Sequence, residues 1–182
     1  MAKIILSLFD YTGNWSQPYV DAGYEVVRLD KQNGDDVVLT PYLLGGEVHG
    51  VLAAPPCTEF AGSGARWWRD KDPKLLLDGL ALIDATYRIV AVQQPKWWCL
   101  ENPIGRLPTF LGPPKMYFDP CDYGDPYTKK TALWGNFNQP IKNRIQPTQG
   151  SKMHLIPPGP NRANLRSATP KGFAKAFFEA NP

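Results

Sequence analysis

The sequence predicts a doubly wound α/β fold, built on a mostly parallel sheet. Short apolar runs with strand character alternate with helical periodicity from the start of the chain to about Gly135. Such a β-α-β rhythm is typical of a sheet that is covered by helices on both faces. With 182 residues, of which 43% are hydrophobic and 20% charged, the chain has the size and composition of one globular domain.

Strands are predicted over short segments rich in apolar residues, and helices where apolar residues recur at helical spacing. The longest helix, 74–92, places Leu76, Leu80, Ile83, Tyr87 and Val90 on one face. A last helix is predicted over 170–180, with Thr169 as its cap and Pro170 in its first turn. The other predicted elements are the strands 4–9, 25–29, 48–54, 96–100 and 131–134 and the short helix 15–22.

Composition excludes several classes of protein. No apolar run approaches the ~20 residues of a membrane span. The N-terminus lacks the apolar length and the cleavage pattern of a signal peptide, so we expect a cytoplasmic protein with no membrane partner. The three cysteines, Cys57, Cys99 and Cys121, form no close pair, so neither a disulfide framework nor a zinc site is predicted. The oligomeric state is left open.

Cationic residues are concentrated toward the C-terminus. From residue 129 to 182, nine Lys and Arg residues stand against one acidic residue, Glu179, although the whole chain carries only +3. Such a tract either is a solvated surface or binds phosphates. Residues 136–165 are rich in Pro, Asn, Gln and Gly and show little periodicity. We therefore expect a single domain over 1–182 that carries a short basic loop.

Two tripeptides follow predicted buried strands. Pro55-Pro56-Cys57 comes after the run 51–54, and Glu101-Asn102-Pro103 comes after the run 97–100. Ligands of α/β sheets bind at the carboxyl ends of the strands, so we expect the Cys57 thiol and the Glu101 carboxylate to share one substrate. A lone cysteine at a strand end is more often a small buried hydrophobe. The Pro-Pro before Cys57, together with Glu101, favours a nucleophile, whereas Cys99 and Cys121 are assigned to packing.

This pair of motifs resembles the catalytic core of the cytosine-C5 DNA methyltransferases, in which Pro-Pro-Cys supplies a nucleophile and Glu-Asn-Val holds the base. Pro103 stands where that family has Val. The resemblance implies the Rossmann-like S-adenosylmethionine-dependent methyltransferase fold, with S-adenosyl-L-methionine as the cofactor. It also implies that Cys57 adds to C6 of cytosine, that Glu101 stabilises the adduct and that Asn102 braces its loop. Arg66 is expected to meet a phosphate or the base.

Further segments are similar to the family's cofactor site. Residues 8–13 resemble Phe-x-Gly-x-Gly, except that Tyr11 replaces the first Gly. Asp30 ends the second strand, where an acidic residue binds ribose hydroxyls. Asp36 matches the carboxylate that meets the adenine amino group, with Asp35 as the alternative. The cofactor residues implied by the resemblance are Phe9, Asp10, Tyr11, Thr12, Gly13, Asp30, Asp36 and Pro55.

The segment 122–131 resembles Tyr-Gly-x-Pro-Gln-x-Arg-x-Arg, but Tyr127, Lys129 and Thr131 replace Gln and the two Arg residues. Lys129 keeps a positive charge near the catalytic carboxylate or a phosphate, although it lacks the Arg fork. Thr131 carries no charge, so reduced catalytic efficiency is expected.

The segment 166–171 fits two patterns of the same family. As Arg-x-Leu-Thr-Pro-Arg it organises a target-recognition region, and as Asn-Ser/Ala-Val-Pro it starts a helix that returns over the cofactor. We favour the second pattern, because a doubly wound sheet needs a closing helix.

The stretch from Asn136 to Leu165 replaces a recognition region that in sequence-specific members is on the order of 100 residues. It offers cations for phosphates and few groups that read base edges. We therefore expect DNA as a partner, bound with little sequence preference, and leave open a separate recognition partner. The expected nucleic-acid contacts are Lys142, Arg144, Lys152, Arg162 and Arg166.

Three functions remain open. The leading hypothesis is a minimal cytosine-C5 DNA methyltransferase, and the second is methylation of RNA or of a free cytosine nucleotide. The third is a catalytically inactive, methyltransferase-like protein that binds DNA or a partner. Cys57 and Glu101 favour an enzyme, whereas Tyr11, Tyr127 and Thr131 favour the inactive protein.

Overall fold

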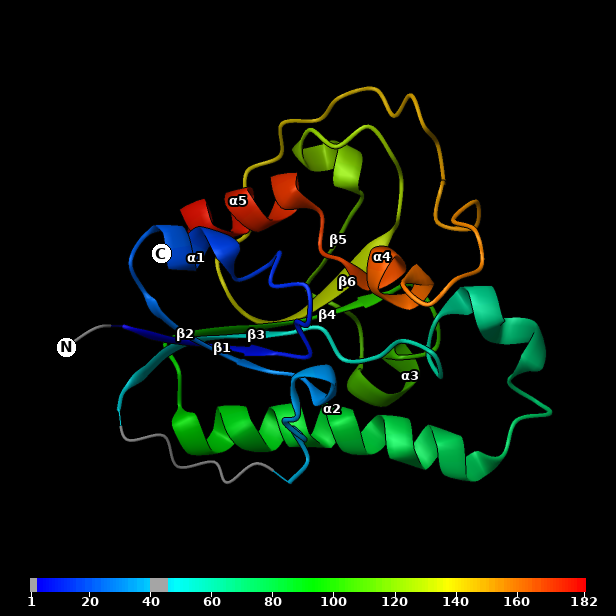
Figure 1. The fold of residues 1–182 in the computed structure, drawn as a ribbon, viewed down its shortest axis with the longest axis horizontal. Helices are drawn as coiled ribbons and strands as arrows, with labels where there is room; N and C mark the ends of the chain where they lie inside the picture. Colours follow the sequence, from blue (N-terminus) through cyan, green and yellow to red (C-terminus); the bar gives the residue numbers. More distant parts are fainter. Residues whose placement is uncertain (1–2, 40–45) are drawn as a thin grey trace.

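The computed structural model describes residues 3–39 and 46–182. A six-stranded sheet in the order β2-β1-β3-β4-β6-β5 runs through the middle of this part of the chain (Figure 1). Strands β1 (Ile4–Leu8), β2 (Glu25–Leu29), β3 (Val48–Ala53) and β4 (Trp97–Pro103) pair in parallel. Strand β6 (Thr131–Asn136) is antiparallel to both β4 and β5 (Met116–Phe118). The mostly parallel sheet is confirmed.

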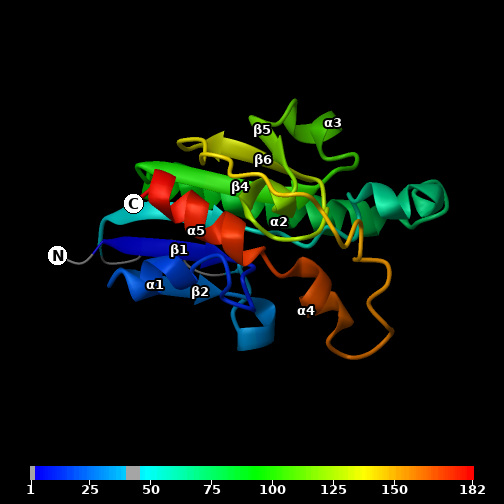
Figure 2. The ribbon, with the colours of Figure 1, turned by 90° about the horizontal axis from the view of Figure 1, so that it is seen from above.

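Helices cover both faces of this sheet, so the doubly wound architecture is confirmed as well. Helix α2 (Pro73–Gln93) lies along one face, and α1 (Gln17–Asp21) and α5 (Lys171–Ala180) lie along the other (Figures 1 and 2). Alternate strand residues point to opposite faces, which divides the core in two. Leu6 and Leu8 belong to the α2 side, whereas Ile5 belongs to the α1 and α5 side.

The predicted apolar face of α2 is the face that packs on the sheet. Ile83 is buried in that core, and the other four members of the predicted stripe are partly buried against it. They are Leu76, Leu80, Tyr87 and Val90.

Aromatic rings fill the core on the opposite face. Phe173 and Phe177, one helical turn apart on α5, are fully buried beside Trp15. Phe173 also stacks on Phe118 of β5, with ring centroids 4.0 Å apart. These contacts hold α5 over the sheet as its closing helix. They bring the segment that precedes α5 to the loop after β1, where the Asn14 side chain donates to the Thr169 carbonyl.

Short elements account for most differences from the sequence-based expectation. Strand β4 continues to Pro103, so Glu101 and Asn102 lie inside the strand and pair with Leu133 and Ala132 of β6. Helix α5 has Pro170, not Thr169, at its N-cap, and no side chain caps it, so the predicted Thr169 cap is wrong. Pro170 has an extended ψ of 133°, so the helix begins at Lys171, one residue later than the N-cap preference of Thr predicts. The elements without a predicted counterpart are β5, α3 (Pro108–Leu111), α4 (Arg162–Ser167) and the 3-10 turns η1 (Lys31–Asn33), η2 (Gly62–Trp67) and η3 (Pro120–Tyr123).

Among the described residues, no helix combines the length and the apolar character that crossing a membrane requires.

Candidate functional site

The path of the chain creates a switch point beside β1. From β1 the chain passes to β2 on one side, and it then crosses back to form β3 on the other side. Crevices form outside the carboxyl ends of strands at such a point. The loops after β1, β2 and β3 meet there, and these loops carry most of the predicted site residues.

The loop after β1 turns sharply at both ends. Phe9 has a φ of 59° and Gly13 a φ of 69°, which are left-handed values that a residue with a Cβ adopts at a cost. A Cβ at Gly13 would also collide with the Arg28 guanidinium. Tyr11, in the place of the family's first Gly, points to solvent and is 44% exposed. The substitution therefore leaves the loop intact.

Asp10 is buried and organises this loop from within. Its Oδ2 accepts hydrogen bonds from the Ser7 hydroxyl (2.9 Å), the Ser16 hydroxyl (2.8 Å) and the Ser16 backbone N–H (3.2 Å). The structure thus places this carboxylate as a brace of the loop, and its direct contact with a cofactor stays a prediction.

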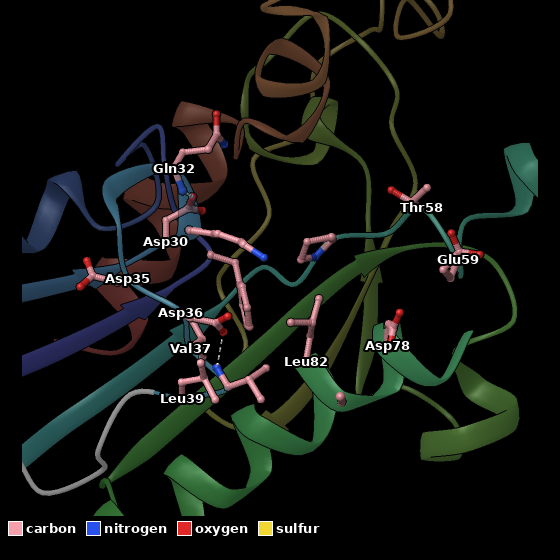
Figure 3. A pocket seen from close by; sticks show the side chains of 16 residues that line it. Asp30, Gln32, Asp35, Asp36, Val37, Leu39, Thr58, Glu59, Asp78 and Leu82 are labelled. Atoms are coloured by element: carbon pink, nitrogen blue, oxygen red, sulfur yellow. Dashed lines mark hydrogen bonds between the residues drawn. The ribbon is translucent and has the colours of Figure 1, made fainter. Parts of the chain in front are cut away.

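A cavity of about 650 Å³ opens between the loops after β2 and β3 and helix α2 (Figure 3). Asp30 follows the last residue of β2 and lines this cavity. The Oδ1 atom of Asp30 accepts a hydrogen bond from the Gln32 backbone N–H at 2.8 Å. Asp36 accepts from the Val38 backbone N–H at 2.9 Å. Within the described residues, the cavity is lined by three of the predicted cofactor residues, Phe9, Asp30 and Asp36, by Asp35 and by Pro56 in place of Pro55.

Helix α2 supplies a wall of this cavity that sequence reasoning missed. Asp78, Gly79 and Leu82 line it. A Cβ at Gly79 would come within 3.2 Å of the Phe60 ring, so this glycine lets the helix approach the loop that follows Cys57. An isolated Gly inside a strong helical pattern was the available signal, since such a residue often has a packing reason.

The cavity suits an adenosine with a cationic tail. Apolar atoms of Phe9, Val37 and Leu82 offer surface to an aromatic ring, and Asp30 and Asp36 offer oxygens to hydroxyl or amino donors. The lining also holds Asp35, Glu59 and Asp78, so its charge is predominantly negative. S-adenosylmethionine carries a sulfonium and an ammonium against one carboxylate, and the residues present fit it.

Next to the cavity, the two predicted motifs come together. The Cys57 side chain is half-buried. The main-chain carbonyl of Cys57 accepts hydrogen bonds from the Phe60 and Ala61 backbone N–H groups, so the chain forms a turn directly after Cys57. Glu101 and Asn102 are buried on the neighbouring strand β4. Within the part of the chain that the structure describes, Glu101 Oε2 has no hydrogen-bond partner. A buried polar atom without a partner is costly, so this oxygen marks a place for a ligand donor.

Charge and burial couple these two groups. Burial raises the pKa of Glu101, Lys129 opposes the shift and Asp10 adds to it. Burial also raises the pKa of the Cys57 thiol, and the Glu101 charge raises it further, whereas Lys129 and Arg166 lower it. Lys129 and Arg166 are the cations whose charge reaches the Cys57 thiol.

The three positions at which the segment 122–131 departs from the family pattern have different surroundings. The Lys129 charge lowers the pKa of both Glu101 and Cys57. Thr131 is buried and donates its hydroxyl to the Lys129 carbonyl at 2.8 Å, so it supports the turn that carries Lys129. The Tyr127 ring lies under the Lys152 ammonium, at 4.2 Å from the ring centroid.

Most cations predicted to bind nucleic acid have structural partners. Lys142 and Arg144 pair with the buried Asp122 at 2.8 and 2.9 Å, which anchors the basic loop to η3. Their side chains remain 46% and 63% exposed, so they still face solvent. Arg162 donates to the Ile156 carbonyl. Arg66 lies apart from this group, exposed on η2.

Buried Cys99 and Cys121 pack in the core as predicted, and all three cysteines are free. Across residues 3–39 and 46–182, no cluster of His, Cys, Asp and Glu is arranged to hold a metal ion.

Comparison with known proteins adds one relative and one solved structure. No family model matches the sequence. The "Probable DNA (cytosine-5)-methyltransferase" of Frog virus 3 (isolate Goorha) is 33% identical over 149 residues, which cover 71% of this chain and 69% of the viral protein. A crystal structure described as "putative DNA modification methyltransferase encoded within prophage", from E. coli, is 17% identical, with a TM-score of 0.48. That match covers 74% of this chain and 47% of the other, so this chain spans about half the length of the solved protein.

Proposed function

This chain belongs to the DNA (cytosine-5)-methyltransferase family, and we propose that it transfers a methyl group from S-adenosylmethionine to C5 of cytosine in DNA. One juxtaposition carries the proposal. The half-buried Cys57 stands beside buried Glu101, whose Oε2 lacks a partner among the described residues, and a cavity of about 650 Å³ opens next to them. A nucleophile, a hydrogen-bonding carboxyl group and room for a cofactor are the parts that this reaction needs.

Cys57 is the proposed nucleophile. Cytosine C5 is a weak nucleophile, and addition of the Cys57 sulfur to C6 turns the ring into an enamine in which C5 is electron-rich. The cofactor supplies the electrophilic methyl group that C5 takes. Loss of the C5 proton to a base then restores the ring double bond and expels Cys57 as the thiolate.

Glu101 is proposed to hold the base during this sequence. Because burial raises its pKa, the carboxyl group is biased toward the protonated form, which donates to N3 of cytosine. Its other oxygen accepts from the exocyclic amine. The hydrogen bond to N3 strengthens as negative charge develops there on attack by sulfur, which is the condition for catalysis rather than mere binding.

Lys129 and Arg166 are proposed to favour the thiolate. Both lower the pKa of Cys57 against burial and the Glu101 charge. A protonated Glu101 that donates to N3 of cytosine carries no charge to oppose the thiolate. The thiol proton is then lost to a base, and the thiolate adds to C6.

The residues proposed to hold the cofactor follow from the cavity. Asp30 accepts from the ribose hydroxyls, and its cap to Gln32 fixes the orientation of the carboxylate. Asp36 meets the adenine amino group, and Phe9 packs on the ring. The negative lining favours the cationic tail.

We propose that DNA is bound with little sequence preference. The loop between β6 and α4 offers cations for phosphates, and Lys142 and Arg144 hold it to Asp122 in a defined path. Phosphate contacts position a protein on DNA without reading its sequence. The target base must leave the stack or be presented unpaired, because C5 and C6 are inaccessible inside a duplex.

Trapping with 5-fluorocytosine DNA tests this function, because fluorine at C5 blocks the final elimination. The wild-type protein with S-adenosylmethionine should form a covalent complex, and Cys57→Ser should form none while keeping its fold. Cys99→Ala serves as the control. Adduct that survives Cys57→Ser but disappears in Cys121→Ala would overturn the assignment. Tritium transfer to duplex DNA, single-stranded DNA, RNA and dCTP separates DNA methylation from RNA or nucleotide methylation, and no transfer to any of them would favour an inactive binding protein.

A further inference from the structure

We propose that Trp67 is a stacking platform for an unpaired base of the DNA strand that carries the target cytosine. Trp67 ends η2, between Arg66 and Arg69, and its side chain is 55% exposed. The DNA setting rests on the proposed function, whereas the stacking surface itself rests on the contacts below.

The chemistry around Trp67 matches a nucleic acid strand. The Arg66 guanidinium lies 5.1 Å from the ring centroid. Arg66 and Arg69 are both exposed, and among the residues that the structure describes neither makes an ion pair. Exposed rings with adjacent cations are how proteins bind single strands without sequence preference, because every base has a π-face and every nucleotide a phosphate.

Contacts between η2 and the segment that follows β4 hold the turn that carries Trp67 in place, and we call these contacts its mount. They distinguish Trp67 from a side chain that is merely exposed. The Gly62 backbone N–H, at the start of η2, donates to the Ile104 carbonyl at 2.8 Å, and Ala61 forms a β-bridge with Gly105. A Cβ at Gly105 would collide with the Phe60 carbonyl, so only glycine allows the two segments to approach this closely.

The neighbouring tryptophan is part of this mount. Arg106 donates from Nε to the Glu59 carbonyl at 2.7 Å, and its guanidinium lies 4.7 Å from the ring centroid of the half-buried Trp68. At the far side of η2, Lys71 pairs with Glu59 at 2.8 Å. Trp68 therefore anchors the turn while Trp67 faces outward, and little conformational freedom is left to lose on binding.

This mount connects the platform to both catalytic motifs. Residues 57–62 lead directly from Cys57 into η2, and residues 104–106 follow directly from the strand that carries Glu101. In Figure 1, η2 is the teal coil beyond the carboxyl ends of the strands, at the end of the molecule where α4 also lies. A strand that places a cytosine at Cys57 and continues along η2 would bring a neighbouring base to Trp67.

Stacking on Trp67 requires a base with a free face. In a duplex, each internal base is already stacked on both sides, so the platform contributes little there. The inferred substrate class is therefore DNA with an unpaired base next to the target cytosine, such as a single strand. This preference does not depend on base identity.

Equilibrium binding to oligothymidylate tests the platform apart from catalysis, because this oligonucleotide contains no cytosine to methylate. Fluorescence anisotropy of a labelled 12-mer should show that Trp67→Ala weakens binding about 5- to 150-fold, which corresponds to about 1–3 kcal/mol per stacked base. Trp67→Phe should restore most of the affinity. The matched control is Leu77→Ala, which removes an apolar side chain that is 64% exposed on α2.

Two further arms complete the test. A 12-mer of abasic residues should bind wild type and Trp67→Ala alike, and a duplex should show a much smaller effect of the substitution. Equal affinity of wild type and Trp67→Ala for oligothymidylate, or an equal loss with the abasic strand or in Leu77→Ala, would overturn the inference. Methyl transfer to DNA with no role for Trp67 would refute the platform alone. A Trp67-dependent affinity without methyl transfer would refute the proposed function alone.

Discussion

The Asn102 side-chain amide donates a hydrogen bond of 2.9 Å to the main-chain carbonyl of Pro55. Parallel pairing of β3 with β4 ends at Ala53 and Leu100, and Pro55 and Pro56 have no N–H with which to continue it. The Asn102 side chain thus takes over where the ladder stops. It joins the strand of Glu101 to the loop of Cys57, so one hydrogen bond fixes the two proposed catalytic groups relative to each other.

Loss of this bond should damage both the fold and the chemistry. Asn102→Ala should lower the free energy of unfolding by about 1–3 kcal/mol, because the buried Pro55 carbonyl loses its partner. It should also slow covalent trapping, because the Cys57 loop is released. Urea unfolding and trapping kinetics measure the two effects. Asn102→Asp keeps the shape without the donor and should behave at least as badly; an active, fully stable Asn102→Asp would refute the role.

Thiol reactivity should report the coupling between Cys57 and Glu101. Burial and the Glu101 charge raise the pKa of Cys57. Glu101→Gln removes that charge, so the pKa should fall and alkylation by iodoacetamide at a fixed pH below it should speed up. Lys129→Met should do the opposite, because Lys129 lowers the same pKa. Rates as a function of pH, followed by mass spectrometry at Cys57, check both directions, and identical profiles for all three proteins would contradict the coupling.

Cofactor binding should depend on the Asp30 carboxylate more than on its neighbour. Asp30→Asn keeps an oxygen to cap η1 at Gln32 but loses an acceptor for the ribose. Affinity for S-adenosylmethionine should drop by about 1.5–3 kcal/mol, as for a hydrogen bond to a charged group. Asp35→Ala, at a second carboxylate of the same cavity, is the control and should cost less. Calorimetry that finds Asp30→Asn unchanged would place the cofactor elsewhere.

The anchor of the basic loop should be visible as a pH-dependent stability. Burial opposes ionisation of Asp122, but the hydrogen bonds from Lys142 and the Asp119 backbone, with the Lys142 and Arg144 charges, lower its pKa below the usual value. The resulting stabilisation is complete above the unfolded-state pKa of about 3.9 and is lost as the pH falls through the folded-state value. Lys142→Met should destabilise the protein at pH 7 by about 1–2 kcal/mol, since the lysine is partly exposed. Thermal unfolding should show this deficit shrinking below pH 4; a deficit that persists at pH 2 would indicate lost packing instead.

DNA affinity should fall with salt in proportion to the phosphate contacts. Lys152→Ala should reduce the slope of log affinity against log salt by roughly 0.7–0.9 if its ammonium contacts one phosphate. Lys175→Ala is the matched control, because that lysine lies on α5, outside the basic loop 136–165, and pairs with Glu179. Titrations on several duplex sequences should give the same change in each. A strong preference for one short sequence would contradict nonspecific binding.

Local signals accounted for the elements that carry the site. Short runs rich in Ile, Leu and Val located β1, β2 and β3, and the stripe from Leu76 to Val90 located α2 with its buried face. The predicted end of β4 at Leu100 was wrong, because Glu101 and Asn102 are polar residues of the kind that usually stand in loops. Their burial depends on pairing with β6, which approaches from 30 residues further along the chain. The short elements β5, α3 and α4 contain too few residues for periodicity to appear.

The sequence by itself determined which chemical groups this protein has and at which end of the sheet they stand. The alternation of strands and helices sets the direction of each strand. The carboxyl ends of the parallel strands therefore lie at one edge of the sheet, and this edge carries Cys57, Asp30 and the pair Glu101-Asn102. Only the tertiary structure decided the partners of the groups. Lys142 and Arg144 lie on Asp122, the Arg166 charge reaches Cys57, and Glu101 Oε2 is left unpaired within the described residues. These relationships depend on the paths of irregular segments, which long-range packing sets and no local periodicity encodes.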